Sequence, residues 1–298
     1  MSRRPGKSGD FSRQDTQGAS PARDTFSRSS ANTTEASGTP PSPLPIPNLS
    51  LPKGGGAIRG MGEKFAANPA TGTASLTIPI FTSPGRAGNA PQLALTYDSG
   101  AGNGPFGLGW SLGLPTITRK TDRGLPRYAD ADESDVYILA GVEDLVPVLR
   151  PDGTRYSDDT TAPGYVIHRY RPRIEGLFAR IERWTHMASG EIHWRSITKD
   201  NVTTLYGQDN HSRIFDPAEL DPRSPTDLDK AHPTRIFAWL VCQSYDDKGN
   251  AVAYQYVAEN SDGVEVTAAH EQNRSPAART ANRYLKRVLY GNRAPNRD

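Results

Sequence analysis

Residues Gly54–Arg119 read GGGAIRGMGEKFAANPATGTASLTIPIFTSPGRAGNAPQLALTYDSGAGNGPFGLGWSLGLPTITR, and the fold assignment starts from this stretch. Three short runs in it alternate apolar and polar side chains, at Ala74–Ile80, Gln92–Asp98 and Thr116–Lys120. A period of two is typical of a β-strand with one buried face. Glycine and proline interrupt every connection between the runs, which predicts strands joined by tight reversals.

The same pattern continues to the end of the chain. Further strands are expected at Ser134–Leu139, Leu145–Leu149, Tyr165–Arg171, Phe178–Thr185, Glu191–Thr198, Val202–Tyr206, Arg235–Tyr245, Ala251–Val257 and Asn282–Tyr290. No stretch of ten or more residues shows the period and the caps of an amphipathic helix. Frequent short strands without helices predict an all-β fold with many short antiparallel strands.

The connections differ in length and in chemistry. Asp246–Asn250 reads DDKGN between two strands and predicts a hairpin, while Ser189-Gly190 suggests a two-residue turn. Asp216–Thr234 is rich in Pro and Asp, and we expect a long surface loop there. Arg235–Tyr245 is apolar on both faces, which predicts a strand covered on both sides and belonging to the core.

Residues 1–52 differ in composition from the rest of the chain. They are rich in Ser, Pro, Thr, Arg and Gly and nearly lack large apolar groups, so burial cannot offset the entropy lost on ordering. We expect a disordered tail over 1–52, with polyproline II character at Pro40–Pro52, and a folded domain over 53–298. No apolar segment follows the basic N-terminus, so no signal peptide is recognised.

Charge, cysteine content and hydropathy exclude several classes. The formal net charge is +2, too near balance to predict a nucleic-acid partner. The single cysteine, Cys242, rules out an intramolecular disulfide and lies in an apolar run, where buried packing is expected. No apolar run approaches the roughly 20 residues of a transmembrane helix, so direct membrane insertion is not expected.

Two glycine motifs match signatures of catalysis or cofactor binding. Gly102–Gly107 fits the dinucleotide pattern G-x-G-x-x-G, and Gly109–Gly113 fits the hydrolase pattern G-x-S-x-G with Ser111 as nucleophile. Both signatures require a helix directly after the motif, and the surrounding Gly and Pro residues prevent one. We therefore interpret both as reversals between strands, although His186, His193, His211 or His232 could in principle supply a base.

His186 and His193 flank the expected turn at Ser189-Gly190. A two-residue turn would place the two imidazoles directly across from each other, but a zinc site needs three or four ligands, and only Glu182 and Glu191 are near. We favour an ordinary cross-strand pair. The aromatic residues that could line a sugar-binding face, or simply pack the sheet, are Trp184, Trp194, Trp239, Tyr245, Tyr254 and Tyr256. Catalytic residues, metal ligands and cofactor-binding residues are therefore predicted as none.

Gly54–Ile80 together with Gly85–Tyr128 resembles the N-terminal domain shared by the Salmonella virulence protein SpvB and the B components (TcaC/TcdB type) of insecticidal toxin complexes. Asp135–Val148, Arg235–Asn260 and Arg283–Asn296 fit the same domain. The resemblance implies a curved, shell-like sheet without catalysis. In toxin complexes such shells enclose a toxic polypeptide and dock on a pore-forming component, which delivers it to host cells.

The resemblance also sets the expected partners and location. They are a C component carrying RHS repeats and a pore-forming A component, or the remainder of a split B component, with the protein acting extracellularly after folding in the bacterial cytoplasm. The propeller and RHS-repeat regions of B components and a transferase domain are not found in the sequence, so a truncated or split form is expected. Two alternatives remain open, the delivery region of an ADP-ribosylating effector and a stand-alone adhesion module.

Overall fold

The computed structural model describes residues 64–68, 72–141, 143–176, 178–221, 223 and 227–296. Within these ranges the predicted all-β class is confirmed, because 18 strands are formed and the only α-helix, α1 (Pro276–Arg279), has four residues. All pairings between the strands are antiparallel. The tail predicted over residues 1–52 lies outside the described residues.

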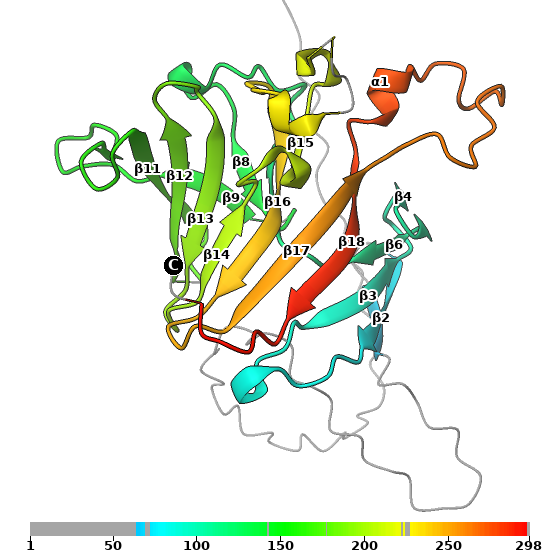
Figure 1. Cartoon of the computed structure of the whole chain (residues 1–298), viewed down its shortest axis with the longest axis horizontal. Coiled ribbons are helices and arrows are strands. Elements are labelled where there is room, and N and C mark those ends of the chain that lie inside the picture. The colour runs from blue at the N-terminus through cyan, green and yellow to red at the C-terminus, as the bar shows by residue number, and fades with distance from the viewer. Residues whose placement is uncertain are drawn as a thin grey trace, which may run out of the picture. The chain divides into compact units, whose positions relative to one another are not determined.

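Eight strands form a closed ring. In order they are β7 (Thr116–Arg119), β8 (Tyr137–Leu139), β9 (Glu143–Pro147), β11 (Tyr165–Pro172), β12 (Arg180–His186), β13 (Ile192–Ile197), β14 (Thr203–Tyr206) and β16 (Ile236–Tyr245). β16 pairs with β7 through Ala238–Leu240 and with β14 through Val241–Tyr245, which closes the ring (Figure 1). The expected curved sheet thus closes on itself.

Aromatic side chains fill the ring. An interior enclosed by eight strands is just wide enough to be filled by side chains. Trp194 and Trp239 are both 0% exposed, and their ring centroids lie 5.9 Å apart. Tyr137 stacks edge-on against both indoles, at 4.8 Å and 5.8 Å. Trp239 Nε1 donates a hydrogen bond to Ile192 O at 2.8 Å, which ties the filling to the ring wall.

Charged groups occupy the interior beside the aromatic filling. The Arg119 side chain is 0% exposed and donates to Asp130 through both terminal nitrogens, at 2.6 Å and 2.8 Å. It also donates to Asp135 at 2.8 Å and to Ile236 O at 2.7 Å. Both carboxylates come from the β7–β8 connection, so this connection is anchored to the ring through one arginine. A buried guanidinium needs such complete pairing.

β16 is the strand around which the remaining elements are arranged. Besides β7 and β14 it pairs with β15 (Arg213–Phe215) and β17 (Ala251–Ala258), and β17 continues to β18 (Arg283–Tyr290). A short strand, β10 (Ser157–Asp158), pairs with β11. Ile236 and Ala238–Val241 are all buried. This confirms the prediction of a core strand covered on both faces.

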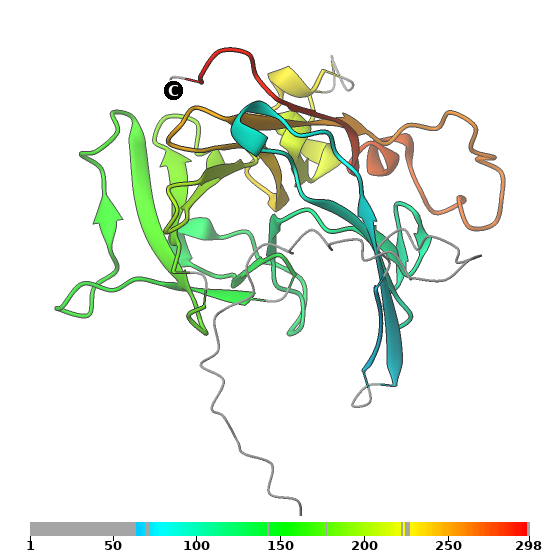
Figure 2. The same ribbon diagram turned by 90° about the horizontal axis from the view of Figure 1, so that it is seen from below.

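A second sheet of four strands precedes the ring in the chain. Its order is β1 (Lys64–Asn68), β2 (Thr73–Ile80), β3 (Leu93–Asp98) and β6 (Trp110–Leu112). The connection from β2 to β3 contacts the end of the β17–β18 hairpin, where Ser83 Oγ lies 3.0 Å from Tyr290 Oη and Arg86 Nη1 lies 3.4 Å from Gly249 O. Figure 2 shows the β1–β2 end of this sheet extending away from the ring strands.

The sequence expectation of a surface loop between β15 and β16 is wrong. The segment Asp216–Thr234 is not purely a surface loop, because Leu220, Leu228 and Ala231 are buried in the core. Asn210 Nδ2 donates to the carbonyls of Leu228 and Ala231 at 2.8 Å and 2.7 Å, which satisfies the backbone of the buried turn. Strands β1 and β15 were not expected, since both are short and lack clear alternation.

Candidate interaction surfaces

The dinucleotide-like motif forms a hairpin. Asn103–Gly104 (β4) pairs with Gly107–Leu108 (β5), and Pro105-Phe106 make the turn. The reversal expected from the sequence is therefore present. A helix does not start at this position, so the backbone amides and the helix dipole that hold a pyrophosphate are not assembled here.

The reversal expected at the hydrolase-like motif is wrong, because Trp110–Leu112 of this motif form β6 of the four-stranded sheet. Ser111 lies in the middle of β6, opposite Thr96 of β3, and the two hydroxyl oxygens are 2.9 Å apart. A nucleophile elbow needs a strand-to-helix turn and a histidine base. The four histidines considered as bases have contacts elsewhere: His186 with Ser189, His211 with Asp229, His232 with Glu191, and His193 with aromatic rings.

The expected register at the histidine pair is wrong. The turn takes four residues, Met187–Gly190, because Gly190 adopts a left-handed φ of 73° and its N–H bonds to His186 O. The register therefore shifts by two residues, and His193 lies opposite Trp184 while His186 lies opposite Glu191. In the part of the chain that the structure describes, no group of three or more His, Cys, Asp or Glu residues could hold a metal ion.

The four-stranded sheet carries an apolar row on one face. We call it the apolar sheet face; from the strand registers it consists of Phe65, Leu76, Ile78, Ile80, Leu93, Leu95, Tyr97, Trp110 and Leu112. None of these side chains is buried; Phe65 is 73% exposed and Ile80 is 43% exposed at opposite ends of the row. The other face carries Thr77, Thr96 and Ser111. The other seven side chains of the row are half-buried, and an apolar row that stays partly exposed along its length is typical of a contact surface.

A groove lies on the outer surface of the ring strands. We call it the ring groove; it has a volume of about 260 Å³ and is lined by Trp184, His193, Arg195, Leu205, Gln208, Gln243 and Tyr245. These residues come from β12, β13, β14 and β16 and from the segment after β14, and on β12 and β13 they alternate with the buried interior residues. The groove is therefore held by four hydrogen-bonded strands of the closed ring.

A buried carboxylate lies under one side of the ring groove. Glu182 is 0% exposed and accepts hydrogen bonds from Trp184 Nε1 at 3.0 Å and from Arg195 Nε at 2.9 Å. Arg180 also pairs with it. The guanidinium of Arg195 stacks over the Trp184 indole, with Cζ 4.6 Å from the ring centroid. Burial, with Arg213 and Arg195 nearby, lowers the pKa of His193 to about 4, so this imidazole is neutral at pH 7.

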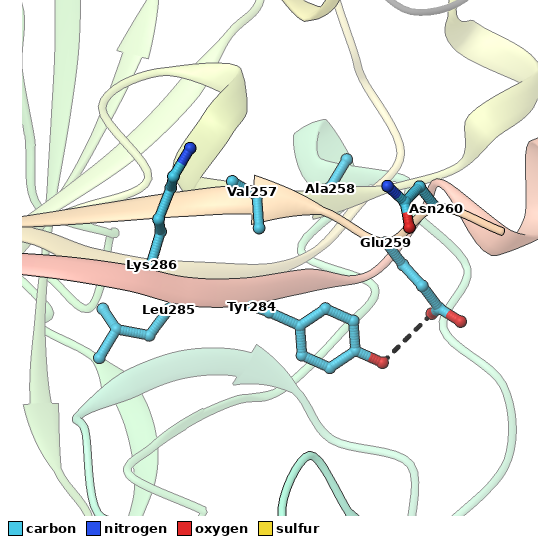
Figure 3. Close-up of a pocket in the computed structure, with 7 residues that line it drawn as sticks. All are labelled: Val257, Ala258, Glu259, Asn260, Tyr284, Leu285 and Lys286. Carbon is cyan, nitrogen blue, oxygen red and sulfur yellow. Dashed lines mark hydrogen bonds between the residues drawn. The ribbon is translucent and has the colours of Figure 1, made fainter. Parts of the chain in front are cut away.

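A wider hollow lies beside strands β17 and β18. It has a volume of about 540 Å³ and is lined by Val257, Ala258, Glu259, Asn260, Tyr284, Leu285 and Lys286. Figure 3 shows Lys286 on the opposite side of its strand from Leu285 and Tyr284. Tyr284 Oη donates to Glu259 at 3.3 Å, and Glu259 also accepts from Arg274 at 2.6 Å (Figure 3 draws the first bond). Tyr284 and Glu259 of this hollow are therefore paired with each other, whereas Asn260 Nδ2 donates to Asp262 at 2.7 Å.

Cys242 is half-buried, its thiol donates to Leu205 O at 3.3 Å, and burial raises its pKa, as expected for a packing residue. Among the described residues, no helix has the length and the apolar character needed to cross a membrane.

Comparison with known proteins decides the family. The family model described as Salmonella virulence plasmid 65kDa B protein matches residues 68–298. The chain belongs to the SpvB family. It is 35% identical over 256 residues to Mono(ADP-ribosyl)transferase SpvB of Salmonella choleraesuis, covering 84% of this chain and 39% of that relative. It therefore spans about two fifths of the length of this curated SpvB protein.

Solved structures of SpvB-family relatives extend the likeness to the fold. The crystal structure of TcdB2-TccC3 matches with a TM-score of 0.65 at 35% identity, over 85% of this chain and 11% of that chain. The N-terminal domain of effector protein SpvB from Salmonella typhimurium strain LT2 matches with a TM-score of 0.58 at 33% identity, over 74% and 66%. The Photorhabdus luminescens Tc holotoxin pore matches with a TM-score of 0.64 at 36% identity, over 84% and 11%.

These matches show an SpvB-type N-terminal domain and support the expected link to toxins and virulence. The matched part of SpvB is its N-terminal domain, and the matched toxin structures are Tc toxin complexes. Sequence reasoning named Trp184, His193 and Tyr245 of the ring groove as aromatic or histidine candidates. It missed Gln208 and Gln243, because a single amide side chain carries no sequence pattern.

Proposed function

We propose that this chain is a non-catalytic structural part of a bacterial toxin-complex B component. It contributes a section of the β-shell that encloses a toxic polypeptide for delivery to host cells, and it acts outside the bacterium. Its partners are a C component with RHS repeats and a pore-forming A component, or the remainder of a B component. This proposal includes the assignment of residues 53–298 to the shell domain and of residues 1–52 to a Ser-, Pro- and Arg-rich tail.

The observation that carries the proposal is the apolar sheet face. Nine apolar or aromatic side chains form one contiguous row, and Phe65 and Ile80 at its ends remain 73% and 43% exposed. The same face carries no carboxylate and no histidine. Exposure of this kind is unfavourable for an isolated domain and is relieved when another polypeptide covers the row. A domain that makes up a small part of a long chain, as in the TcdB2-TccC3 match, has such a neighbour available.

The test is co-purification with the other components after co-expression. We expect the chain to bind a B- or C-component polypeptide and Ile78→Glu to weaken this binding at least tenfold, because a charge would be buried at the interface. Thr77→Glu is the matched control, since it adds the same charge to the opposite face of the same strand. No association, or equal effects of both variants, would refute the proposed role of this face.

A second candidate is the delivery region of an ADP-ribosylating effector. It is favoured by the name of the curated relatives, Mono(ADP-ribosyl)transferase SpvB, of which this chain covers about two fifths. The two candidates predict different partners for the apolar sheet face, a shell polypeptide or a transferase domain. Both candidates propose that this chain itself has no catalytic activity. Incubation of the chain with labelled NAD⁺ and host-cell extract tests this, and transfer of label to extract proteins would contradict it.

A further inference from the structure

We propose that the ring groove is a binding site for a neutral hexose-based oligosaccharide. The inference is independent of the proposed shell role, because the ring groove and the apolar sheet face belong to different sheets. An aromatic ring and several polar groups without partners in the protein converge in this groove.

The polar groups of the ring groove lack partners within the protein. Neither the Gln208 amide nor the Gln243 amide makes a hydrogen bond to another side chain or to the backbone within the described residues, and the same holds for the Tyr245 hydroxyl. Each amide offers two N–H donors and one carbonyl acceptor, and the hydroxyl offers both functions. Neighbouring hydroxyl groups on a sugar ring both donate and accept hydrogen bonds, and these side chains offer both functions.

The aromatic part of the groove suits the apolar face of a pyranose ring. Trp184 and Tyr245 both line it, and Trp184 is tied in place by the hydrogen bond from Nε1 to Glu182 and by the Arg195 guanidinium. Because its polar edge is bonded to Glu182 and Arg195 covers one ring face, the indole can offer only its remaining carbon surface to a ligand. Aromatic side chains with a few oriented polar groups are the usual composition of a small-ligand site.

The electrostatics of the groove favour a neutral ligand. Arg195 faces it, but two nitrogens of this guanidinium lie 2.9 Å from Glu182, so these N–H groups are already engaged from below. His193 is uncharged at pH 7 and offers a ring nitrogen as donor or acceptor. An anionic sugar would have to compete with Glu182 for Arg195, whereas neutral hydroxyls need no such exchange.

The site is also rigid before any ligand arrives. Its residues are placed by continuous pairings, with Trp184 opposite His193, Arg195 opposite Leu205, and Leu205 opposite Gln243. Side chains on adjacent strands of a closed ring cannot separate without breaking the ring. Little ordering entropy is therefore lost on binding, which partly offsets the small contact area of a groove of about 260 Å³.

The full chain is titrated with maltotriose, lactose, N,N′-diacetylchitobiose and the anionic 3′-sialyllactose. Binding is measured by calorimetry and by tryptophan fluorescence. We expect at least one neutral probe to bind with a dissociation constant on the order of 1 mM. Gln243→Ala should weaken this binding about tenfold through the lost amide contacts. Gln255→Ala, an exposed glutamine on β17, is the matched control and should change nothing.

Trp184→Ala provides a second variant, and thermal unfolding of each variant verifies that the fold is retained. Binding of sialyllactose alone would overturn the neutral-sugar assignment, and binding of no probe would overturn the site. If Gln243→Ala and Trp184→Ala instead abolish binding of a toxin component while sugar binding is unchanged or absent, the groove is a protein contact and the proposal fails.

Discussion

The closed ring and the four-stranded sheet have similar strand chemistry but very different degrees of burial. The ring encloses two fully buried tryptophans and a buried arginine, and almost every one of its strands carries buried residues. The four-stranded sheet has a well-formed apolar row, yet none of its described strand residues is buried. The difference indicates that the ring is stable through its own core, whereas the apolar face of the sheet is only partly covered within the described residues.

The largest expected loss of stability is for a tryptophan of the ring, compared here with a tryptophan of the four-stranded sheet. Trp194→Ala removes a fully buried indole from the ring and should lower the free energy of unfolding by about 4 kcal/mol, since the cavity cannot collapse. Trp110→Ala removes a half-buried indole from β6 and should cost about 2 kcal/mol, because part of its surface already contacts water. Urea unfolding followed by circular dichroism measures both. Equal losses would contradict the contrast between the two sheets.

The second prediction concerns the buried guanidinium of Arg119, which lies in the ring and has no buried counterpart among the described residues of the four-stranded sheet. Arg119→Met leaves Asp130 and Asp135 without their cation, and we expect a loss of about 3 kcal/mol. Lys120→Met is the neighbouring control; Lys120 pairs with Asp144 at 2.8 Å but is partly exposed, so its loss should stay below about 1 kcal/mol. The same urea titrations compare them, and a loss for Arg119→Met no larger than for Lys120→Met would show that the buried network contributes no net stability.

The sequence revealed the strands of the ring more readily than its polar interior. Arg235–Tyr245 was predicted as a two-faced core strand because both of its alternating sets are apolar, a signal contained within one segment. Arg119 ends a strand with ordinary alternation, and nothing local distinguishes it from an exposed arginine. Its burial follows from Asp130 and Asp135, which reach it only because the β7–β8 connection folds back onto the ring.

The candidate site shows the same division between local and non-local information. Trp184, His193 and Tyr245 could be named in advance as aromatic or histidine candidates. Their placement relative to one another could not, because it depends on the length of the Met187–Gly190 turn, and a change of two residues there moves His193 from His186 to Trp184. Likewise, the ring closure that brings β16 beside β14 joins segments about 40 residues apart.

The third prediction concerns pH, which acts on the ring and leaves the apolar sheet face unchanged. Burial opposes ionisation of Asp130 and Asp135, but hydrogen bonds from Arg119 and from backbone N–H groups outweigh it and lower the pKa of both carboxyls. Burial lowers the pKa of His168 and of His193 to about 4. For all four groups the unfolded chain binds more protons as pH falls, so stability decreases toward acid.

The decrease should begin below about pH 6.5, where histidine in the unfolded chain is protonated, and steepen below about pH 4, where the carboxylates are protonated. Urea midpoints at pH 7, 5 and 3.5 measure the profile, and the effect between pH 7 and 5 should be comparable with that of Arg119→Met. His168→Gln should remove about half of the part between pH 7 and 5, since His193 contributes the rest, and leave the acid part unchanged. A level profile down to pH 5 in the parent chain would refute the assignment to these two histidines.

The smallest expected contrast compares two glycines that each face an aromatic ring. A Cβ on Gly207 (φ 61°) would lie 2.3 Å from Trp239 Cδ1, and a Cβ on Gly109 (φ 79°) would lie 2.6 Å from Tyr97 Cε2 and 2.7 Å from Asp98 O. Alanine is strained at both φ values. Gly153→Ala (φ 83°, with no atom near the added Cβ) isolates this backbone strain and should cost roughly 1 kcal/mol.

Beyond that shared strain, the two sites should differ in how far the neighbouring ring can move. Trp239 is fully buried and bonded to Ile192 O, so Gly207→Ala should cost roughly 2–3 kcal/mol. Tyr97 is only half-buried and can rotate toward solvent, and Asp98, whose carbonyl must also shift, is the exposed last residue of β3, so Gly109→Ala should cost roughly 1–2 kcal/mol. If Gly109→Ala costs as much as Gly207→Ala in the chain alone, the four-stranded sheet is as tightly held as the ring. The apolar sheet face would then need no partner to be stable.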